Sequence, residues 1–534
     1  MGKVVLISTY ELGRQPFGLA SPAAWLAEAG ADVAVQDLAV SAFEPAPVRD
    51  ALLVGIYVPM HAATRMAESV LTRVREHNAH VHVCVYGLYA PMNADHLIRL
   101  GADSVIGGEF EAPLTRLYHE LAAGPGQDGG RPAAAPVISL DRQQFLVPDR
   151  IGLPELMRYA ALQVGPGTFR TAGYTEASRG CKHLCRHCPV VPVYGGRFRV
   201  VQAGTVLNDI RQQVASGAQH ITFGDPDFLN APAHSLRIIT QLHAEFPQLS
   251  YDVTVKVEHL CRHAALLPVL KRTGCALVTT AAEALDDGIL ERLDKGHTVA
   301  DLDHALRLLR DNGLAVNPTF IAFTPWTTLH GYAEFLRAIV RSGLVDLISP
   351  VQYGIRLLIP RGSRILELDD VAAMAGGFDP NALAYPWPNP DPQVDDLCRD
   401  VLDQVKAGQR AGRNRRETFL QVWQATAARL EPGAPPAPDL TTLPAADGTV
   451  PQLTEPWYCC AEPTDDQLAG YERRETTGKI VYVTVTSGHT ASGAWLPDLA
   501  SAICWAGDYR PVVFPVFCLL VRCLPGCLTV LAPE

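Results

Sequence analysis

The chain has 534 residues, 48% of them hydrophobic and 19% charged, which is enough for several globular domains with their own cores. Its formal net charge of −11 argues against general nucleic-acid binding, because no basic block offsets the acidic excess. The start, MGKVVLISTYELGRQ, has only a short apolar run, and the apolar stretch around Arg522 is interrupted by prolines. We therefore expect a cytoplasmic protein without an export signal or a membrane span.

Five apolar runs alternate with helical patterns over residues 1–123. The runs are KVVLIST, ADVAVQDLAV, ALLVGIYVPM, HVHVCVYGLY and ADSVIGG. Strands that alternate with helices predict a doubly wound, Rossmann-like parallel sheet. The Gly- and Pro-rich residues 124–136 then predict a flexible linker.

Residues 137–375 repeat strand and helix about six times, which predicts a partial parallel barrel of (β/α)6 type within an overall α/β fold. The candidate strands are GYTEAS, HITFGD, YDVTVKV, ALVTTA, AVNPTFIAF and LISPVQYG. Reactive groups of such barrels lie at the carboxyl ends of the strands.

Beyond the barrel, the sequence predicts a helical extension, a second linker and an irregular tail. The helical pattern covers 376–430, and the Pro-rich linker covers 431–451. A cysteine-bearing motif lies within 452–466, and 467–534 is an extension of unknown role.

The stretch RGCKHLCRHCP places Cys181, Cys185 and Cys188 directly after the first barrel strand. Thiolates are soft ligands that select iron–sulfur clusters, zinc or copper. Structural zinc takes four protein ligands, so His183 or His187 would have to complete a zinc site. Three thiolates on a four-iron cluster instead leave one iron open to a further ligand. The remaining alternative is three buried, inert thiols.

Three basic residues accompany these cysteines in the sequence. Arg179, Lys182 and Arg186 are expected to lower the thiol pKa values. They are also expected to balance the charge of an anionic cluster.

The cysteine spacing, after a strand in a strand–helix repeat, resembles the radical S-adenosylmethionine (SAM) superfamily. The resemblance implies that Cys181, Cys185 and Cys188 hold a [4Fe-4S] cluster whose open iron binds the amino and carboxylate groups of SAM. It implies reductive cleavage of SAM to methionine and a 5′-deoxyadenosyl radical. A flavodoxin- or ferredoxin-like protein is the expected electron donor. One departure is His187, which stands where the family commonly has an aromatic residue.

The segment FGDPDF (223–228) occupies the place of the family's Gly-Gly-Glu segment, which meets the amino group of SAM. The resemblance implies that Gly224 allows a close backbone approach and that Asp225 or Asp227 pairs with the ammonium. The alternative for Asp227 is a helix N-cap.

The segment AAEALDDGILERLDKGHT resembles a later part of the same family. It implies a position for Glu283 near the ribose, and a closing turn at Lys295 and Gly296, where a helix C-cap is the alternative. Lys256 and Glu258, expected on the third barrel strand, either face the cofactor or are solvated strand ends.

Residues 1–123 resemble the cobalamin-binding module that precedes many radical SAM barrels. VYGLYAP and IGGEFEAP match its glycine turns, which implies cobalamin contacts at Gly87, Gly107 and Gly108. The cobalt-ligating histidine loop has no counterpart, because the chain after the first strand reads STYELGR. Cobalamin would then bind without a histidine below the cobalt, or the domain is a scaffold.

The segment EPWYCCAEPTDD carries the adjacent pair Cys459 and Cys460 after the Pro-rich linker. It resembles the radical SAM proteins named for a CCAEP or CUAEP tail, where U is selenocysteine. The resemblance implies chemistry at Cys460. The pair could be a redox couple, hold a second metal, or bind a soft metalloid or selenium species. The alternative is two cysteines without a role.

Together these patterns predict a radical SAM enzyme that acts on an unknown small-molecule substrate with help from Cys459 and Cys460. Two other hypotheses remain. One is a cobalamin-dependent radical SAM methyltransferase. The other is a non-enzymatic iron–sulfur redox sensor.

Overall fold

The computed structural model describes residues 2–124, 136–431, 438–443, 450–455, 520–524 and 527–531. The chain divides into two compact units, Met1–Leu468 and Ala469–Glu534. In the second unit the described residues form a hairpin, in which β16 (Leu520–Leu524) pairs antiparallel with β17 (Cys527–Leu531). The rest of the description concerns the first unit.

The amino-terminal sheet is parallel and has the strand order β2-β1-β3-β4-β5-β6. Its first five strands are the predicted ones: β1 (Lys3–Ser8), β2 (Asp32–Asp37), β3 (Ala51–Tyr57), β4 (His82–Tyr86) and β5 (Ser104–Gly108). A sixth strand, β6 (Val137–Ser139), joins the edge beyond β5. Three residues are too few to show a periodicity, so the sequence alone gives no sign that this sheet continues past the linker.

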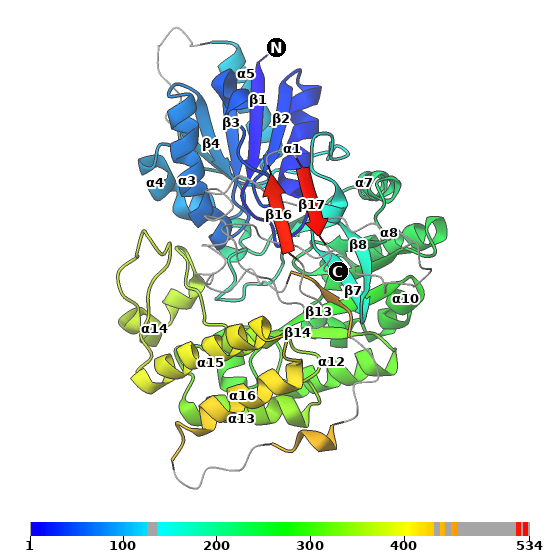
Figure 1. Ribbon diagram of the computed structural model, residues 1–534, viewed down its shortest axis with the longest axis vertical. Coiled ribbons are helices and arrows are strands. Elements are labelled where there is room, and N and C mark those ends of the chain that lie inside the picture. The colour runs from blue at the N-terminus through cyan, green and yellow to red at the C-terminus, as the bar shows by residue number, and fades with distance from the viewer. Residues whose placement is uncertain are drawn as a thin grey trace. The chain divides into compact units, whose positions relative to one another are not determined.

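Helices lie on both sides of this sheet, as the doubly wound pattern predicts (Figure 1). They are α1 (Phe17–Glu28), α2 (Pro45–Arg49), α3 (His61–His77), η1 (Pro91–Asn93), α4 (Ala94–Arg99) and α5 (Glu111–Ala122). In α3, Met66, Val70 and Val74 recur at helical spacing and are buried. Burial of such a side chain stabilises the fold by about 1.5–3 kcal/mol.

The second sheet has the strand order β14-β13-β12-β11-β8-β7-β15. Its parallel strands are five of the six predicted ones: β8 (Thr168–Thr175), β11 (His220–Phe223), β12 (Ser250–Thr254), β13 (Cys275–Glu283) and β14 (Val316–Phe320). Two antiparallel strands extend its edge beyond β8, namely β7 (Ala161–Gly165) and β15 (Gln452–Leu453). The chain thus forms the expected partial barrel, with an unpredicted edge that includes residues from beyond the second linker.

The prediction of a sixth strand at LISPVQYG is wrong. This segment contains the 3₁₀ helix η5 (Pro350–Gly354). Proline lacks the N–H that a central strand needs, so Pro350 favours a helical turn over a ladder. The sixth position of the barrel is reduced to a single parallel bridge between Phe323 and Arg356.

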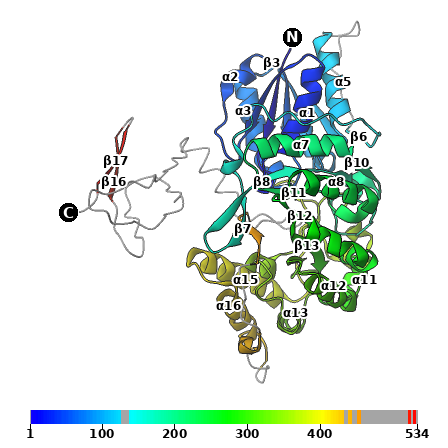
Figure 2. The same ribbon diagram turned by 90° about the vertical axis from the view of Figure 1, so that its right-hand side faces the viewer.

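Helices cover the outside of the partial barrel (Figure 2). They are α7 (Ala203–Ala215), α8 (Pro232–Glu245), α9 (Val257–Arg262), α10 (Leu267–Arg272), α11 (Asp287–Arg292), α12 (Val299–Asp311) and α13 (Leu329–Arg341). The shorter elements are η2 (Leu156–Arg158), β9 (Ser178–Gly180), α6 (Val191–Tyr194), β10 (Phe198–Val200), η3 (Phe228–Asn230), η4 (Ala264–Leu266), η6 (Arg364–Glu367), α14 (Asp369–Met374) and η7 (Leu440–Thr442).

The predicted helical extension is present as α15 (Pro392–Arg410) and α16 (Arg415–Ala427). Trp423 and Phe419 of α16 belong to the core of the barrel, so the extension packs as part of the same body. Across the described part of the chain, every helix is too short or too polar to cross a lipid bilayer.

Candidate functional site

The three clustered cysteines lie on the segment that connects β9 to α6. All three line one cavity of about 440 Å³. Gly180 precedes the first of them with a φ of +74°, and a Cβ there would lie 2.4 Å from the ring of Tyr194. The tight turn therefore needs glycine. Three soft ligands from one short loop, directed at one cavity, fit a [4Fe-4S] cluster with an open iron.

The basic residues next to the cysteines in sequence do not lower the pKa of Cys181, contrary to the expectation. Burial raises the pKa of the Cys181 thiol. Arg186 instead donates hydrogen bonds to carbonyl oxygens at the end of α11. Cations beside the thiols come from other segments: Lys256 Nζ lies 3.7 Å from Cys185 Sγ, and Lys295 interacts with Cys185 and Cys188. Contact between segments distant in sequence sets the charge here, which sequence neighbourhood does not reveal.

Glu283 is the centre of a buried ion cluster on the cavity wall. Its Oε1 lies 3.1 Å from Lys295 Nζ and 3.2 Å from His187 Nε2. Burial alone would raise the pKa of Glu283, but Lys295 and His187 lower it to about 2. The residue also has a φ of +65° at a bulge of β13. Such a backbone costs on the order of 1–3 kcal/mol and clusters at functional sites.

The FGDPDF segment also reaches the cavity, through Gly224 and Asp225. A Cβ on Gly224 would lie 1.8 Å from the hydroxyl of Tyr174, so a neighbouring side chain already requires the glycine. Asp225 Oδ1 accepts a hydrogen bond of 2.5 Å from Ser178 Oγ, and burial raises the pKa of Asp225 to about 7. Asp225 therefore links the end of β11 to β9, the strand directly before the cysteine loop.

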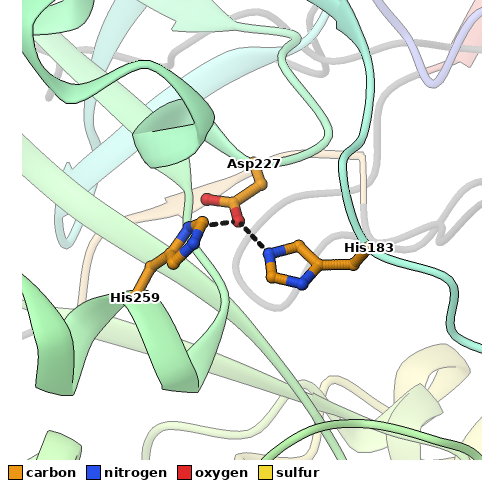
Figure 3. Close-up of side chains that lie close together, drawn as sticks. All are labelled: His183, Asp227 and His259. Atoms are coloured by element: carbon orange, nitrogen blue, oxygen red, sulfur yellow. Dashed lines mark ion pairs between the residues drawn. The ribbon is translucent and has the colours of Figure 1, made fainter. Parts of the chain in front are cut away.

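Asp227 has the role that the N-cap alternative predicts. Its Oδ1 accepts from the backbone N–H of Leu229 at 3.2 Å, at the start of η3. Its Oδ2 faces His183 and His259 instead (Figure 3).

Lys256 and Glu258 do not lie on the third barrel strand, and that expectation is wrong. β12 ends at Thr254, Lys256 is the residue before α9, and Glu258 is in the first turn of that helix. Val255 and Val257 are fully buried and continue the alternation of the strand, which explains the misassignment. Lys256 lines the cavity, and its Nζ lies 3.8 Å from Glu258 Oε2.

Arg179, the first residue of the cysteine motif, holds the barrel to the amino-terminal sheet. Its guanidinium lies 2.6 Å from Glu111, 2.6 Å from Glu176 and 3.4 Å from Glu109. Burial raises the pKa of Glu109 to about 7, while Arg179 lowers it less strongly. This network was not predicted, because Glu109 and Glu111 are about 70 residues from Arg179 in sequence.

The three glycines expected at the cobalamin site, Gly87, Gly107 and Gly108, are required by contacts within the protein. A Cβ on each would clash with a neighbouring atom of the chain. Those atoms are Val58 O at 2.8 Å, Pro91 Cγ at 2.5 Å and Ser139 O at 2.1 Å, respectively. Only Gly108 of the three lines the cavity.

The loop after β1 reaches the cavity through Glu11 and Leu12. The histidines of the described cavity wall are His183 and His187, both from the cysteine loop. The described lining therefore offers no histidine from the amino-terminal sheet to bind a cobalt ion.

Residues 451–455, which include β15, form another wall of the same cavity. The Tyr10 hydroxyl donates to Glu455 Oε1 at 2.9 Å. Cys459 and Cys460 follow shortly in the sequence and lie outside the described residues.

Residues 175–339 match the family model "Radical SAM superfamily". Among curated proteins, the hopanoid C-3 methylase of Methylococcus capsulatus is 25% identical over 230 residues, or 42% of this chain and 43% of that protein. The chain spans less than half the length of the curated relatives it matches.

Two solved structures share the fold across both sheets. OxsB, described as a cobalamin-dependent SAM radical enzyme with aqua-cobalamin bound, superposes with a TM-score of 0.60 at 14% identity, covering 79% of this chain and 72% of OxsB. TsrM of Kitasatospora setae, a radical SAM methyltransferase with tryptophan and a SAM analogue bound, superposes with a TM-score of 0.56 at 18% identity, covering 72% and 82%. The chain thus contains a radical SAM domain, the domain of an enzyme superfamily, which implies a [4Fe-4S] cluster and SAM as cofactors.

Proposed function

We propose that this protein is a radical SAM enzyme that acts on a small-molecule substrate. One observation carries the proposal: the three thiols of the matched domain open into a cavity of about 440 Å³. Cavities of roughly 300–1,000 Å³ suit small ligands. When bound, the cluster supplies the electron that splits SAM into methionine and the 5′-deoxyadenosyl radical.

The residues of the cavity wall have distinct roles in this proposal. Cys181, Cys185 and Cys188 hold the cluster. Lys256 lines the cavity and offers a positive charge to the carboxylate of SAM. Glu283 lines the same cavity, and the family resemblance implies a position for it near the ribose.

The test is the release of 5′-deoxyadenosine from SAM by the anaerobic holoenzyme reduced with dithionite. In the cell a flavodoxin- or ferredoxin-like donor of the reducing cytoplasm would supply the electron. If the cluster is shown to be reduced and no 5′-deoxyadenosine forms, the result contradicts the enzyme proposal and favours the redox-sensor hypothesis.

A cobalamin-dependent methyl transfer is the second candidate. It is supported by the likeness to OxsB and TsrM, which spans the amino-terminal sheet as well as the barrel. The described cavity wall suits only a cobalamin held without a histidine from the amino-terminal sheet. Bound cobalamin would carry the methyl group, and the cavity residues would position its acceptor.

We expect the purified protein to bind cobalamin at best modestly, because the described cavity wall offers no histidine from the amino-terminal sheet. Equilibrium dialysis measures the binding, and electron paramagnetic resonance of the cob(II)alamin form reports nitrogen coordination through its hyperfine splitting. Tight stoichiometric binding with an imidazole nitrogen on cobalt would contradict the expectation.

We further propose that Cys459 and Cys460 act on the substrate or on a later radical species. Glu455 lines the cavity, and Cys460 is five residues further along the chain. A chain spans at most about 3.6 Å per residue, so Cys460 Cα stays within about 18 Å of Glu455 Cα. The CCAEP motif supports a chemical role for this sulfur.

Replacing Cys460 by serine should leave the cluster and a basal release of 5′-deoxyadenosine intact, while product formation stops. Serine keeps the size of the side chain but lacks the polarisable sulfur that redox or soft-ligand chemistry needs. Iron content and the yield of 5′-deoxyadenosine are measured beside the substrate-derived product. Loss of the cluster in C460S would make the pair a ligand, and normal product formation would remove its role.

A further inference from the structure

Three side chains of ligand type converge beside the cysteine loop. The groups are His183 Nε2, Asp227 Oδ2 and a ring nitrogen of His259, which lie within 4.8 Å of one another (Figure 3). Asp227 Oδ2 is 2.6 Å from His259 Nδ1 and 3.5 Å from His183 Nε2. The three residues come from the cysteine loop, the turn after β11 and helix α9, so the fold brings them together.

Asp227 Oδ2 lies at ion-pair distance from both imidazoles, but none of these contacts has the geometry of a hydrogen bond. The side chains of Asp227 and His259 are fully buried, and that of His183 is 14% exposed. Asp227 Oδ2, His183 Nε2 and both ring nitrogens of His259 have no hydrogen-bond partner with acceptable geometry among the described residues. A buried polar group without a partner costs about 1–3 kcal/mol. Two imidazoles that converge on one buried carboxylate oxygen are typical of a ligand set.

The surroundings orient two of the three groups as metal ligands are oriented. The second oxygen of Asp227 is fixed by the backbone N–H of Leu229. The second ring nitrogen of His183, Nδ1, lies 3.6 Å from Glu258 Oε2. A histidine that binds a metal usually directs its other nitrogen to a carboxylate or a carbonyl. Glu258 is itself held by Arg262, so it does not swing freely.

We propose that His183, Asp227 and His259 bind one divalent transition-metal ion, with zinc as the preferred occupant. Two imidazoles and one carboxylate form a donor set that suits zinc with a fourth position open to water. Ligands about 2.0–2.2 Å from a tetrahedral zinc lie about 3.4 Å apart. The 3.5 Å separation already matches, whereas the 2.6 Å contact between Asp227 and His259 must open by about 0.8 Å when the ion binds. For such a set zinc also binds more strongly than ferrous iron.

This metal site uses none of the three cluster cysteines. It would tie the loop between Cys181 and Cys185 to the carboxyl ends of β11 and β12 through His183. It also assigns His183 to an ion other than the cluster, so the cluster keeps its open iron for SAM.

The experiment measures zinc and iron together in the anaerobic holoenzyme after incubation with Zn²⁺ and desalting. We expect one zinc per chain in addition to about four iron. Asp227→Asn and His259→Gln should reduce the zinc at least tenfold while the iron stays near four. His263→Gln is the matched control, because His263 lies one turn along from His259 at a ring distance of 5.5 Å and is outside the ligand set. It should keep the zinc.

Equal zinc in the native protein and in D227N would overturn the proposal, since the ion would then be bound elsewhere. If both variants lose iron as well, the native holoenzyme decides the question through competition with a chromogenic zinc chelator. One-to-one binding tighter than micromolar supports the site, and the absence of stoichiometric binding overturns it. Neither result bears on SAM cleavage, which is measured separately.

Discussion

Replacing Cys181, Cys185 and Cys188 together by alanine should reduce the iron content from about four per chain to near zero and abolish SAM cleavage. Each alanine removes a thiolate, and the described cavity wall provides no other cysteine that could replace them. Iron and sulfide analysis, the visible absorption of the cluster, and the yield of 5′-deoxyadenosine measure the effect.

The matched control is Cys261→Ala. Cys261 is half-buried on α9, outside the cavity, with its Sγ 3.4 Å from the carbonyl oxygen of Asp301. It should keep about four iron. A triple variant that retains a normal [4Fe-4S] spectrum would contradict the ligand assignment. Circular dichroism separates loss of the cluster from loss of the fold.

Replacing Arg179 by methionine should lower the free energy of unfolding at pH 7.5 by about 3–5 kcal/mol. Methionine fills a similar volume but leaves Glu109, Glu111 and Glu176 buried without their common cation. Uncompensated buried carboxylates are strongly destabilising. Urea unfolding of the anaerobic holoenzyme, followed by circular dichroism, measures the change.

The stability that R179M loses relative to the native protein should become smaller as the pH falls. Burial raises the pKa of Glu111, but Arg179 and neighbouring hydrogen bonds bring it below the usual 4.5. A carboxyl whose pKa is lowered by folding contributes stability above about pH 4.5 and loses it as the pH falls through the folded value. Without Arg179 the three carboxyls have raised pKa values, so acid favours the folded variant. The difference in free energy of unfolding between the native protein and R179M should therefore be smaller at pH 5.5 than at pH 7.5.

Arg211→Met is the control for this prediction. Arg211 also binds a glutamate, Glu245, at 2.7 Å, but the pair is exposed to solvent. Surface ion pairs contribute about 0–1 kcal/mol to stability, so the free energy of unfolding of this variant should be close to that of the native protein. An equally small change in R179M would mean that the buried network does not hold the domains together.

The elements that could be predicted from the sequence are those with a strong local pattern. Strands β1, β3, β4 and β5 of the first domain are runs of almost entirely buried residues, and such runs are readily identified in the sequence. The cysteine spacing likewise lies within one loop. The segment LISPVQYG also contains β-favouring residues, but Pro350 has no N–H for a strand ladder and the segment forms a 3₁₀ helix.

The charged part of the site could not be predicted in the same way. Basic residues beside the cysteines in sequence were expected to act on the thiols, whereas Lys256, about 70 residues away, lies next to Cys185. Arg179 serves the carboxylates of the other domain instead. Such pairings depend on which loops the topology brings together, and neither composition nor spacing encodes that directly.

The pairing of β15 with β7 has a consequence for the order in which the protein folds. Gln452 pairs with Gln163, which lies 289 residues earlier in the sequence. Contacts between residues so far apart in sequence are expected to form late in folding. During synthesis the edge of β7 remains unpaired until the ribosome has released residue 453. An unpaired strand edge is a template for association with other chains. We therefore expect the newly made barrel to be more prone to association with other chains before this two-residue strand docks.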